Sequence, residues 1–260
     1  MPHLACQDGV ELNYRIDGDD AAPVLVLSNS LGTDLAMWEP QMRALPQHFR
    51  VLRYDTRGHG MSGLSPAPYA VDRLGKDVLA LLDGLGIAQA HFCGLSMGGM
   101  TGMWLGVHAP DRLGRLVLCN TAAKIGTPEI WNARIAAVEK GGMAAIQPGV
   151  IQRWFTEDFA AAHPDAVSPI AAMLLATAPE GYAAACAAVR DMDQRQAIAA
   201  IRAPTLVIAG THDLATSAAE GRAVADAIPN ATYAELPAAH LSNIESAQAF
   251  TNALLKFLTH

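Results

Sequence analysis

The chain contains little charge and no cluster of basic residues. Charged residues make up 17% of its 260 residues, the formal net charge is −7, and 51% of the residues are hydrophobic. A negative charge without a basic run argues against a nucleic-acid partner. The low charge and the high apolar content argue against disorder, and the length allows one large core.

Cysteine is also scarce, and so are the signals of export and membrane insertion. The cysteines form no CxxC pair and are interpreted as small core residues, which favours a reducing compartment. No apolar run approaches the roughly 20 residues of a spanning helix. The first residues lack the basic start and apolar core of a signal peptide. We therefore expect a soluble, cytoplasmic protein without a membrane partner.

Short apolar runs and helical patterns alternate over most of the chain. Continuous apolar runs, typical of strands buried on both faces of a parallel sheet, occupy residues 23–30, 49–55, 90–96, 113–120 and 204–210. Residues 10–17 alternate as in an edge region of a sheet, and residues 231–237 predict the last strand. Helical spacing lies between several of these runs. The alternation predicts an α/β fold whose mostly parallel sheet is flanked by helices.

The alternation stops between residues 122 and 195. This stretch is rich in alanine, predicts no convincing strand, and is divided by prolines into short helices. We interpret residues 122–195 as a helical cap over one edge of the sheet. The cap would be inserted between a first core segment, residues 1–121, and a second, residues 196–260.

A serine between glycines follows the predicted strand at residues 90–96. Residues 94–98 read GLSMG, a GxSxG pattern that is only moderately specific by itself. The strand before it and the helix-forming run after it are the context of a nucleophile elbow. The glycines would permit a strained turn that exposes the Ser96 hydroxyl, and Met97 would offer its N–H to an oxyanion. A packing turn is the alternative, whereas a phosphate loop would need a lysine that does not follow.

A nucleophilic serine needs a base, and the base needs an acid that orients it. His240 follows the last predicted strand and is our choice among nine histidines, with His212 as the second choice. Asp213 follows the strand at residues 204–210 and is the expected acid, although a helix N-cap is the alternative role for it. The chain order Ser96, Asp213, His240 is that of a serine–acid–histidine triad built on such an elbow.

The loop after the strand at residues 23–30 should supply a second oxyanion donor. It reads SNSLGTDLAMW, in which the Leu31 N–H is the expected donor and Gly32 permits a tight backbone path. We expect Asn29 and Ser30 to hold this loop or to contact the substrate.

These segments together resemble a known family. The chain is similar to the 3-oxoadipate enol-lactonases, α/β-hydrolases of the β-ketoadipate pathway of aromatic catabolism, in SNSLGTDLAMWEPQ, YDTRGHGMS, CGLSMGG, GTHDLAT, AAHLSNIE and, within the cap, KIGTPEIWNARI. RGHGxS and GxSxG occur widely, whereas the Asn29–Ser30 loop combined with AAHLSNIE is narrower. One departure is Ser217, where a proline commonly follows DLAT.

The resemblance implies an α/β-hydrolase fold with an eight-stranded sheet and a helical cap. It also implies hydrolysis of 3-oxoadipate enol-lactone to 3-oxoadipate through an acyl-enzyme on Ser96. The partner would be this small lactone, and the reaction would need neither a metal nor an organic cofactor.

The implied substrate carries a free carboxylate, for which the cap should provide a partner. Trp131 and Arg134 are three residues apart on a predicted helix and therefore share a face. We expect Arg134 to pair with the carboxylate, and Trp131 to pack against the ring or to donate its indole N–H. The alternative places Trp131 in the cap core and Arg134 in solvent.

Two other functions fit the same scaffold. The first is another serine hydrolase, such as a carboxylesterase, a carbon–carbon bond hydrolase or a perhydrolase. The second is a ligand receptor that kept the fold without catalysis. The intact serine, acid and base argue against the receptor, and a comparison of the enol-lactone with simple p-nitrophenyl esters would distinguish the hydrolases.

Overall fold

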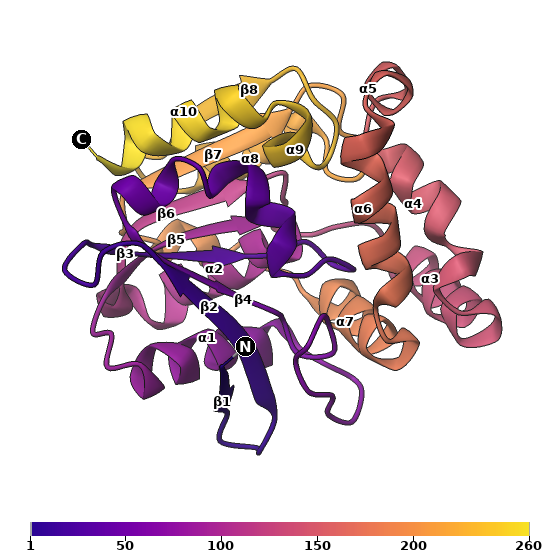
Figure 1. The fold of residues 1–260 in the computed structure, drawn as a ribbon, viewed down its shortest axis with the longest axis horizontal. Helices are drawn as coiled ribbons and strands as arrows, with labels where there is room; N and C mark the ends of the chain where they lie inside the picture. The colour runs from indigo at the N-terminus through magenta and orange to yellow at the C-terminus, as the bar shows by residue number, and fades with distance from the viewer. Residues whose placement is uncertain (1, 260) are drawn as a thin grey trace.

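The computed structural model describes residues 2–259, and its eight strands form one sheet (Figure 1). The strands follow the order β1-β2-β4-β3-β5-β6-β7-β8 across the sheet. Their bounds are β1 His3–Ala5, β2 Glu11–Asp17, β3 Val24–Ser28, β4 Arg50–Tyr54, β5 Ala90–Leu95, β6 Leu113–Cys119, β7 Thr205–Gly210 and β8 Thr232–Leu236. β2 pairs antiparallel with β1 and with β4, and the remaining neighbours run parallel. The predicted α/β fold with a mostly parallel eight-stranded sheet is confirmed.

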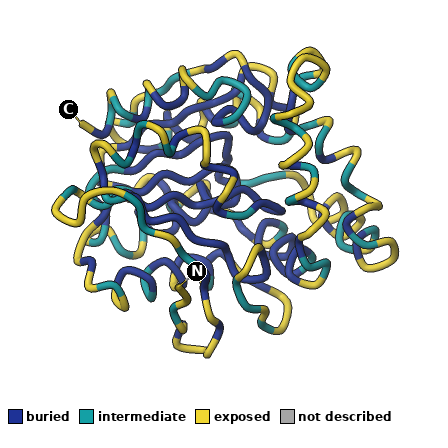
Figure 2. The backbone as a smooth tube through the Cα atoms, viewed as in Figure 1, coloured by how far each residue is buried: buried dark blue, intermediate teal, exposed yellow. Residues whose placement is uncertain are grey.

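The continuous apolar runs of the sequence lie in the middle of this sheet. β3, β5 and β6 each end in four consecutive buried residues, and all six residues of β7 are buried. Figure 2 shows this buried centre with exposed segments around it. Such runs form because helices cover both faces of a parallel sheet. β1 lies at the edge and was not predicted, since its three residues are too few to form a pattern.

Helices pack on both sides of the sheet. α1 (Val71–Gly84) and α10 (Ala247–Leu258) lie on opposite sides in Figure 1. α2 (Met97–His108) follows β5 and is buried along most of its length. The remaining helices of the core are α8 Ala218–Ala227, α9 Ser242–Glu245 and the 3-10 helices η1 Leu35–Gln41, η2 Leu45–Gln47, η3 Pro110–Arg112 and η5 Ala197–Ala200.

A group of helices lies between β6 and β7, within the interval predicted as a helical cap, and is called the helical insertion below. It contains α3 Pro128–Gly141, η4 Met143–Ala145, α4 Gln147–Trp154, α5 Glu157–Ala162, α6 Pro164–Ala176 and α7 Pro179–Asp191. Figure 1 shows it beside the sheet, as a layer separate from the core helices. Proline opens α3, α6 and α7, because the first N–H of a helix needs no partner.

Within residues 2–259 no single helix is both long and apolar enough to cross a membrane. α6 and α7 pass that test of length and composition only when taken together, and they are bent by 95° relative to each other.

Candidate active site

Ser96 lies in the turn between β5 and α2 in a backbone conformation that side chains rarely adopt. Its φ is 56°, and its N–H donates to the Cys119 carbonyl at 2.9 Å. A Cβ on Gly94 would lie 2.1 Å from the carbonyl oxygen of Gly98, and one on Gly98 would lie 2.1 Å from the carbonyl oxygen of Ser28. Both glycines are therefore required by close approaches of the backbone, and the turn has the strained geometry of an elbow.

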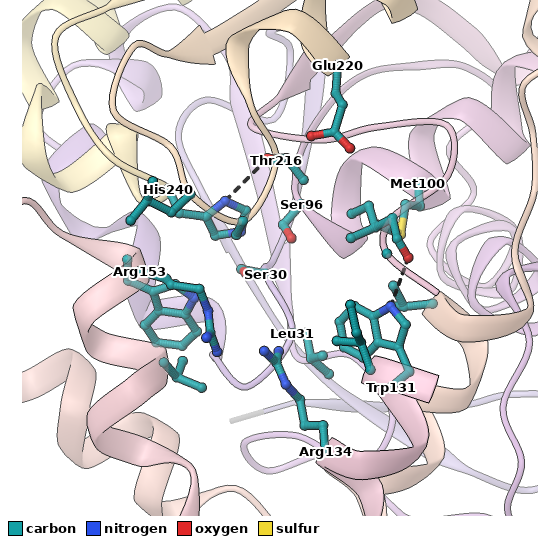
Figure 3. Close-up of a pocket in the computed structure, with 18 of the residues that line it drawn as sticks. Ser30, Leu31, Ser96, Met100, Trp131, Arg134, Arg153, Thr216, Glu220 and His240 are labelled. Carbon is teal, nitrogen blue, oxygen red and sulfur yellow. Dashed lines mark hydrogen bonds between the residues drawn. The ribbon is translucent and has the colours of Figure 1, made fainter. Parts of the chain in front are cut away.

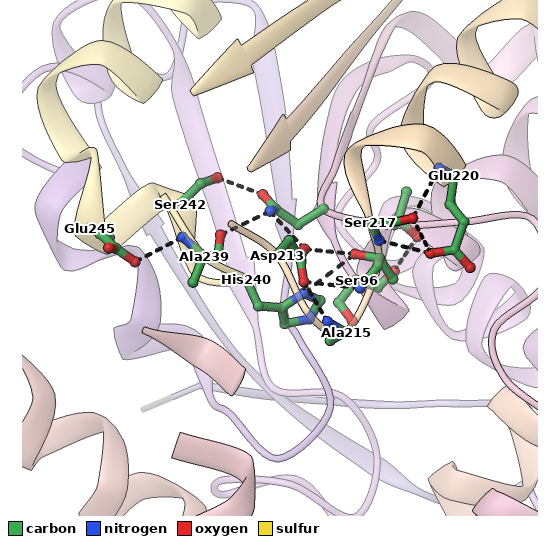
Figure 4. Close-up of polar contacts among 12 residues, drawn as sticks. Ser96, Asp213, Ala215, Ser217, Glu220, Ala239, His240, Ser242 and Glu245 are labelled. Atoms are coloured by element: carbon green, nitrogen blue, oxygen red, sulfur yellow. Dashed lines mark hydrogen bonds and ion pairs between the residues drawn. The ribbon is translucent and has the colours of Figure 1, made fainter. Parts of the chain in front are cut away.

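His240 and Asp213 lie together beside this turn (Figure 4). His240 Nδ1 is 2.8 Å from Asp213 Oδ2, and the two residues are only 3% and 5% exposed. In Figure 3 the His240 ring lies beside the Ser96 side chain, and both residues line one cavity. His212 is exposed and does not line that cavity, so the geometry favours His240 as the base.

The Asp213 carboxylate accepts several hydrogen bonds besides the one from His240. Oδ1 accepts from the backbone N–H groups of Ala215 at 2.7 Å and Thr216 at 2.9 Å, and Oδ2 accepts from the Thr216 hydroxyl at 2.8 Å. Burial alone would raise the pKa of Asp213, but the charge and hydrogen bond of His240, with donors from Thr216 and Asn120, hold the pKa at about 2. The carboxylate is therefore ionised at neutral pH and can stabilise an imidazolium.

The alternative role of Asp213 as a helix N-cap is wrong. α8 begins at Ala218, and its N-cap is Ser217. The Ser217 hydroxyl accepts from the Glu220 N–H at 3.3 Å, and the Glu220 carboxylate accepts from the Ser217 N–H at 2.7 Å. This capping box satisfies the N–H groups of Ser217 and Glu220 without Asp213, whose carboxylate binds His240 and the N–H groups of its own loop.

Asn120, which the sequence analysis missed, connects the acid and the base. It follows β6 with a φ of 44°, and its amide donates to Asp213 Oδ2 at 3.0 Å and to the Ala239 carbonyl at 3.2 Å. Its carbonyl accepts from the Ser242 hydroxyl at 2.5 Å. A polar residue directly after an apolar strand of a parallel sheet was the available signal, because ligands and functional groups gather at that edge.

The two expected oxyanion donors lie on adjacent segments. Met97 is the first residue of α2, and the first N–H groups of a helix have no carbonyl partner within that helix. Leu31 lines the cavity, and the following Gly32 has a φ of 82°. The Gly98 N–H donates to the Asn29 carbonyl at 3.0 Å, which fixes the Leu31 loop against the elbow.

Asn29 and Ser30 have different surroundings. Ser30 lines the cavity beside Ser96. Asn29 does not line it and is fully buried; its amide donates to the Tyr54 carbonyl at 2.8 Å and accepts from the Trp38 indole at 2.9 Å. Of the two roles expected for Asn29, holding the loop fits this geometry, whereas contact with a substrate does not.

The cavity has a volume of about 430 Å³ and lies between the core and the helical insertion (Figure 3). Trp131 and Arg134 of α3 both line it, and the guanidinium carbon lies 4.8 Å from the Trp131 ring centroid. The Trp131 indole N–H donates to the Ile125 carbonyl at 2.9 Å. Trp131 therefore offers the cavity an apolar ring, and of its two expected roles packing against a substrate fits this geometry better than donation of the indole N–H, which already has a partner.

A second arginine, Arg153 of α4, lines the same cavity, and its guanidinium points inward in Figure 3. Within the part of the chain that the structure describes, neither Arg153 nor Arg134 forms an ion pair with a carboxylate. Burial lowers the pKa of Arg153, and the positive charge of Arg134 lowers that pKa further. Burial also raises the pKa of Tyr182, which lines the cavity, so this residue supplies a neutral hydroxyl rather than a counter-charge.

Glu220 also lines the cavity, but its carboxylate accepts hydrogen bonds from Ser217 and forms no ion pair with Arg134 or Arg153. Two cations in one cavity, neither paired with a carboxylate, favour the binding of an anion. Arg134 was predictable from its helical spacing to Trp131, whereas Arg153 was not predicted. The available signal was a basic residue directly before Trp154 at the end of a short helix. Among residues 2–259, no group of three or more His, Cys, Asp or Glu side chains could hold a metal ion.

Known proteins are similar to this chain in sequence and in architecture. The model of the alpha/beta hydrolase fold family matches residues 23–247. The 3-oxoadipate enol-lactonase 2 of Acinetobacter baylyi is 44% identical over 251 residues, which cover 96% of this chain and 94% of that protein. The crystal structure of the enol-lactonase from Burkholderia xenovorans LB400 is 51% identical, with a TM-score of 0.98 and coverage of 100% of both chains. A thermophilic esterase from Thermogutta terrifontis, solved with malate bound, is 30% identical, with a TM-score of 0.92 and coverage of 99% and 97%. The chain thus belongs to the α/β-hydrolase fold family, as a relative of the 3-oxoadipate enol-lactonases.

Proposed function

We propose that the chain hydrolyses 3-oxoadipate enol-lactone to 3-oxoadipate through an acyl-enzyme on Ser96. The observation that carries this proposal is the cavity itself, in which Ser96 and His240 stand opposite two arginines that lack acidic partners. The first group suits an ester carbonyl, and the second suits the carboxylate of the same small molecule. The identities to enol-lactonases, 44% and 51%, support the choice of lactone.

The first half of the reaction uses Ser96, His240 and Asp213. Ser96 Oγ attacks the ring carbonyl carbon while His240 Nε2 accepts its proton. The resulting imidazolium donates through Nδ1 to Asp213, whose pKa of about 2 keeps it negatively charged. Burial of this pair strengthens the interaction, because little solvent screens it.

The negative charge that develops on the carbonyl oxygen needs donors in place before the reaction. We assign this role to the N–H groups of Met97 and Leu31, which lie on the elbow and on the loop fixed to it. Losing one such donor typically lowers kcat by about 10²- to 10³-fold.

Collapse of the tetrahedral intermediate breaks the ring C–O bond and releases an enol oxygen, which remains tethered because the ester is cyclic. An enolate is a far weaker base than an alkoxide, so it leaves readily, and the His240 imidazolium gives it the proton taken from Ser96, which returns His240 to the neutral form. The enol tautomerises to the ketone. Neutral His240 then removes a proton from water as the water attacks the acyl-enzyme, and it passes that proton to Ser96 Oγ when the product carboxylate is released.

We further propose that residues 122–195 act as a cap that recognises the free carboxylate of the lactone. Arg134 and Arg153 approach the cavity from α3 and α4, and an anion between them would relieve their mutual repulsion. The Trp131 ring would pack against the apolar part of the substrate. In this assignment the insertion selects the substrate, whereas the core performs the reaction.

The decisive experiment is a hydrolysis assay with purified protein on the enol-lactone and on p-nitrophenyl esters of similar size. The proposal expects a higher kcat/KM for the lactone, and it expects Ser96→Ala to abolish turnover while the variant keeps its circular dichroism spectrum. A preference for the neutral esters would favour an esterase instead, a role that the 30% identity to the Thermogutta terrifontis enzyme supports. Full activity in Ser96→Ala would refute the assignment of the nucleophile.

A further inference from the structure

The loop that carries His240 is held from the helical insertion as well as from the core. Leu241, the residue after His240, donates its N–H to the Trp154 carbonyl at the end of α4, at 3.0 Å. Ala239, the residue before it, donates its N–H to Glu245 Oε2 at 2.9 Å, a contact drawn in Figure 4. The peptide groups on both sides of the base are therefore held by partners other than the triad.

Glu245 joins this loop to the insertion. Its Oε1 accepts from the Thr156 hydroxyl at 2.5 Å, and its Oε2 accepts from the Thr156 N–H at 3.4 Å. Thr156 is the N-cap of α5, and Glu245 ends α9 of the core. One carboxylate thus binds a peptide beside the base and the junction between two insertion helices.

The same junction forms part of the proposed substrate site. Arg153 and Trp154, which end α4, line the cavity, and Thr156 follows two residues later. Trp154 lines the cavity, and its carbonyl accepts the hydrogen bond from the Leu241 N–H. A shift of residues 153–156 would therefore change both the shape of the cavity and the position of the loop that carries His240.

The core also holds this loop, since the His212 N–H donates to the Ala238 carbonyl at 3.0 Å and the Ile244 N–H donates to the Leu241 carbonyl at 2.9 Å. Asp213 fixes the ring nitrogen Nδ1 at 2.8 Å, and Asn120 binds the Ala239 carbonyl at 3.2 Å. Neither contact sets the distance from His240 Nε2 to Ser96 Oγ, which must fall within about 2.6–3.2 Å for proton transfer. The position of the loop backbone sets this reach, and a misplacement of about 1 Å costs about 10²-fold in rate.

We propose that Glu245 is a positioning residue for His240. Because Glu245 binds both Ala239 and Thr156, the position of the α4–α5 junction sets how closely the His240 ring approaches Ser96. This inference rests on the proposed role of His240 as the base but not on the identity of the substrate. A substrate carboxylate bound at Arg153 would stabilise the junction and so the working position of the imidazole. The insertion would then serve catalysis in addition to recognition.

The test compares kcat and KM in Glu245→Gln, Thr156→Val and the double variant, with Thr156→Ser as the conservative replacement. Each single variant should lower kcat about 10- to 100-fold and change KM by less than about threefold, since substrate contacts remain. Thr156→Ser should retain wild-type kcat. The double variant should be no worse than the worse single variant, because both substitutions break one connection.

Ser246→Ala is the matched control. The Ser246 hydroxyl donates to the Pro237 carbonyl at 3.0 Å, within the same loop region but without a partner in the insertion. This variant should keep wild-type kcat, and thermal melting should show that all variants are folded at the assay temperature. Unchanged kcat in Glu245→Gln and Thr156→Val, or an equal loss in Ser246→Ala, would overturn the inference.

A second substrate separates this inference from the proposed function. Because His240 serves any ester, the loss of kcat should recur with a neutral p-nitrophenyl ester. A protein that fails on the lactone but shows this loss with the ester would refute the lactonase assignment and support the role of Glu245. If the protein hydrolyses the lactone but its Glu245 and Thr156 variants keep full kcat on both substrates, the lactonase assignment is supported and the role of Glu245 is refuted.

Discussion

Replacing Arg153 by methionine tests whether the two arginines bind the substrate carboxylate. Methionine keeps an unbranched apolar side chain, so packing of the stem is largely preserved while the charge is removed. A hydrogen bond to a charged group contributes about 1.5–3 kcal/mol. At about 1.4 kcal/mol per tenfold change, KM for the enol-lactone should rise about 10- to 100-fold. The kcat should change less than KM, because direct binding of the carboxylate is made equally in the ground state and in the transition state. A fall in kcat on the lactone that accompanies the rise in KM would measure the coupling of Arg153 to His240 through the α4–α5 junction.

The free enzyme provides an independent check of the same reasoning. Burial and the charge of Arg134 both disfavour the Arg153 cation when no anion is present. Arg153→Met should therefore not lower the melting temperature, in contrast to most substitutions of half-buried residues. Wild-type protein should also be stabilised by the product, 3-oxoadipate, and the variant less so.

The assay measures initial rates on the lactone and on a neutral p-nitrophenyl ester, in wild type, Arg134→Met, Arg153→Met and a control. Arg195→Met is a suitable control, because Arg195 is exposed and pairs with Asp193 outside the cavity. Both cavity variants should lose affinity for the lactone and keep it for the neutral ester. A KM for the lactone that stays within about twofold in both variants would refute the carboxylate site.

Three further predictions follow from contacts in the core. Gly98→Ala should prevent stable folding or lower the free energy of unfolding by more than about 3 kcal/mol, because its Cβ would lie 2.1 Å from the Ser28 carbonyl oxygen; urea unfolding tests this. The ionised Asp213, with its pKa lowered to about 2, should contribute about 2 kcal/mol of stability above pH 4 that is lost as the pH falls toward 2; a stability that stays flat across this range would contradict it. Ser217→Ala should cost about 1 kcal/mol by removing the N-cap of α8 and leave kcat nearly unchanged; a loss of kcat without a loss of stability would point to the acid loop instead.

The elements that the sequence predicted well are those with local signals. The strands β3, β5, β6 and β7 are continuous apolar runs, because each is covered on both faces. The turn at Ser96 was recognisable because its glycines are required by contacts of the backbone within a few residues or with the adjacent strand. Ser96, Asp213 and His240 each follow a strand, β5, β7 and β8, and these strands lie in the same part of the sheet, so their order along the chain was a usable signal.

The residues that the sequence did not predict act through contacts between distant segments. Asn120 meets Asp213 across 93 residues of sequence, and Glu245 meets Thr156 across 89. The place of Asn120 directly after an apolar strand could mark it as a candidate, but no periodicity or motif shows which distant residue it meets, and the same holds for Glu245. Arg153 was not predicted for the same reason. It matters because it lines the same cavity as Arg134 of another helix, and the sequence of neither helix shows how the two helices pack.

The hydrogen bond from Leu241 to the Trp154 carbonyl restricts how such a protein can be re-engineered by exchange of its parts. Insertions between β6 and β7 can be exchanged between relatives in principle, because both ends of the segment join adjacent strands of the sheet. Here a grafted insertion would have to place a backbone carbonyl where that of Trp154 accepts from Leu241, and a hydroxyl where that of Thr156 donates to Glu245. A graft chosen only for its pocket would bring the desired selectivity together with a misplaced base.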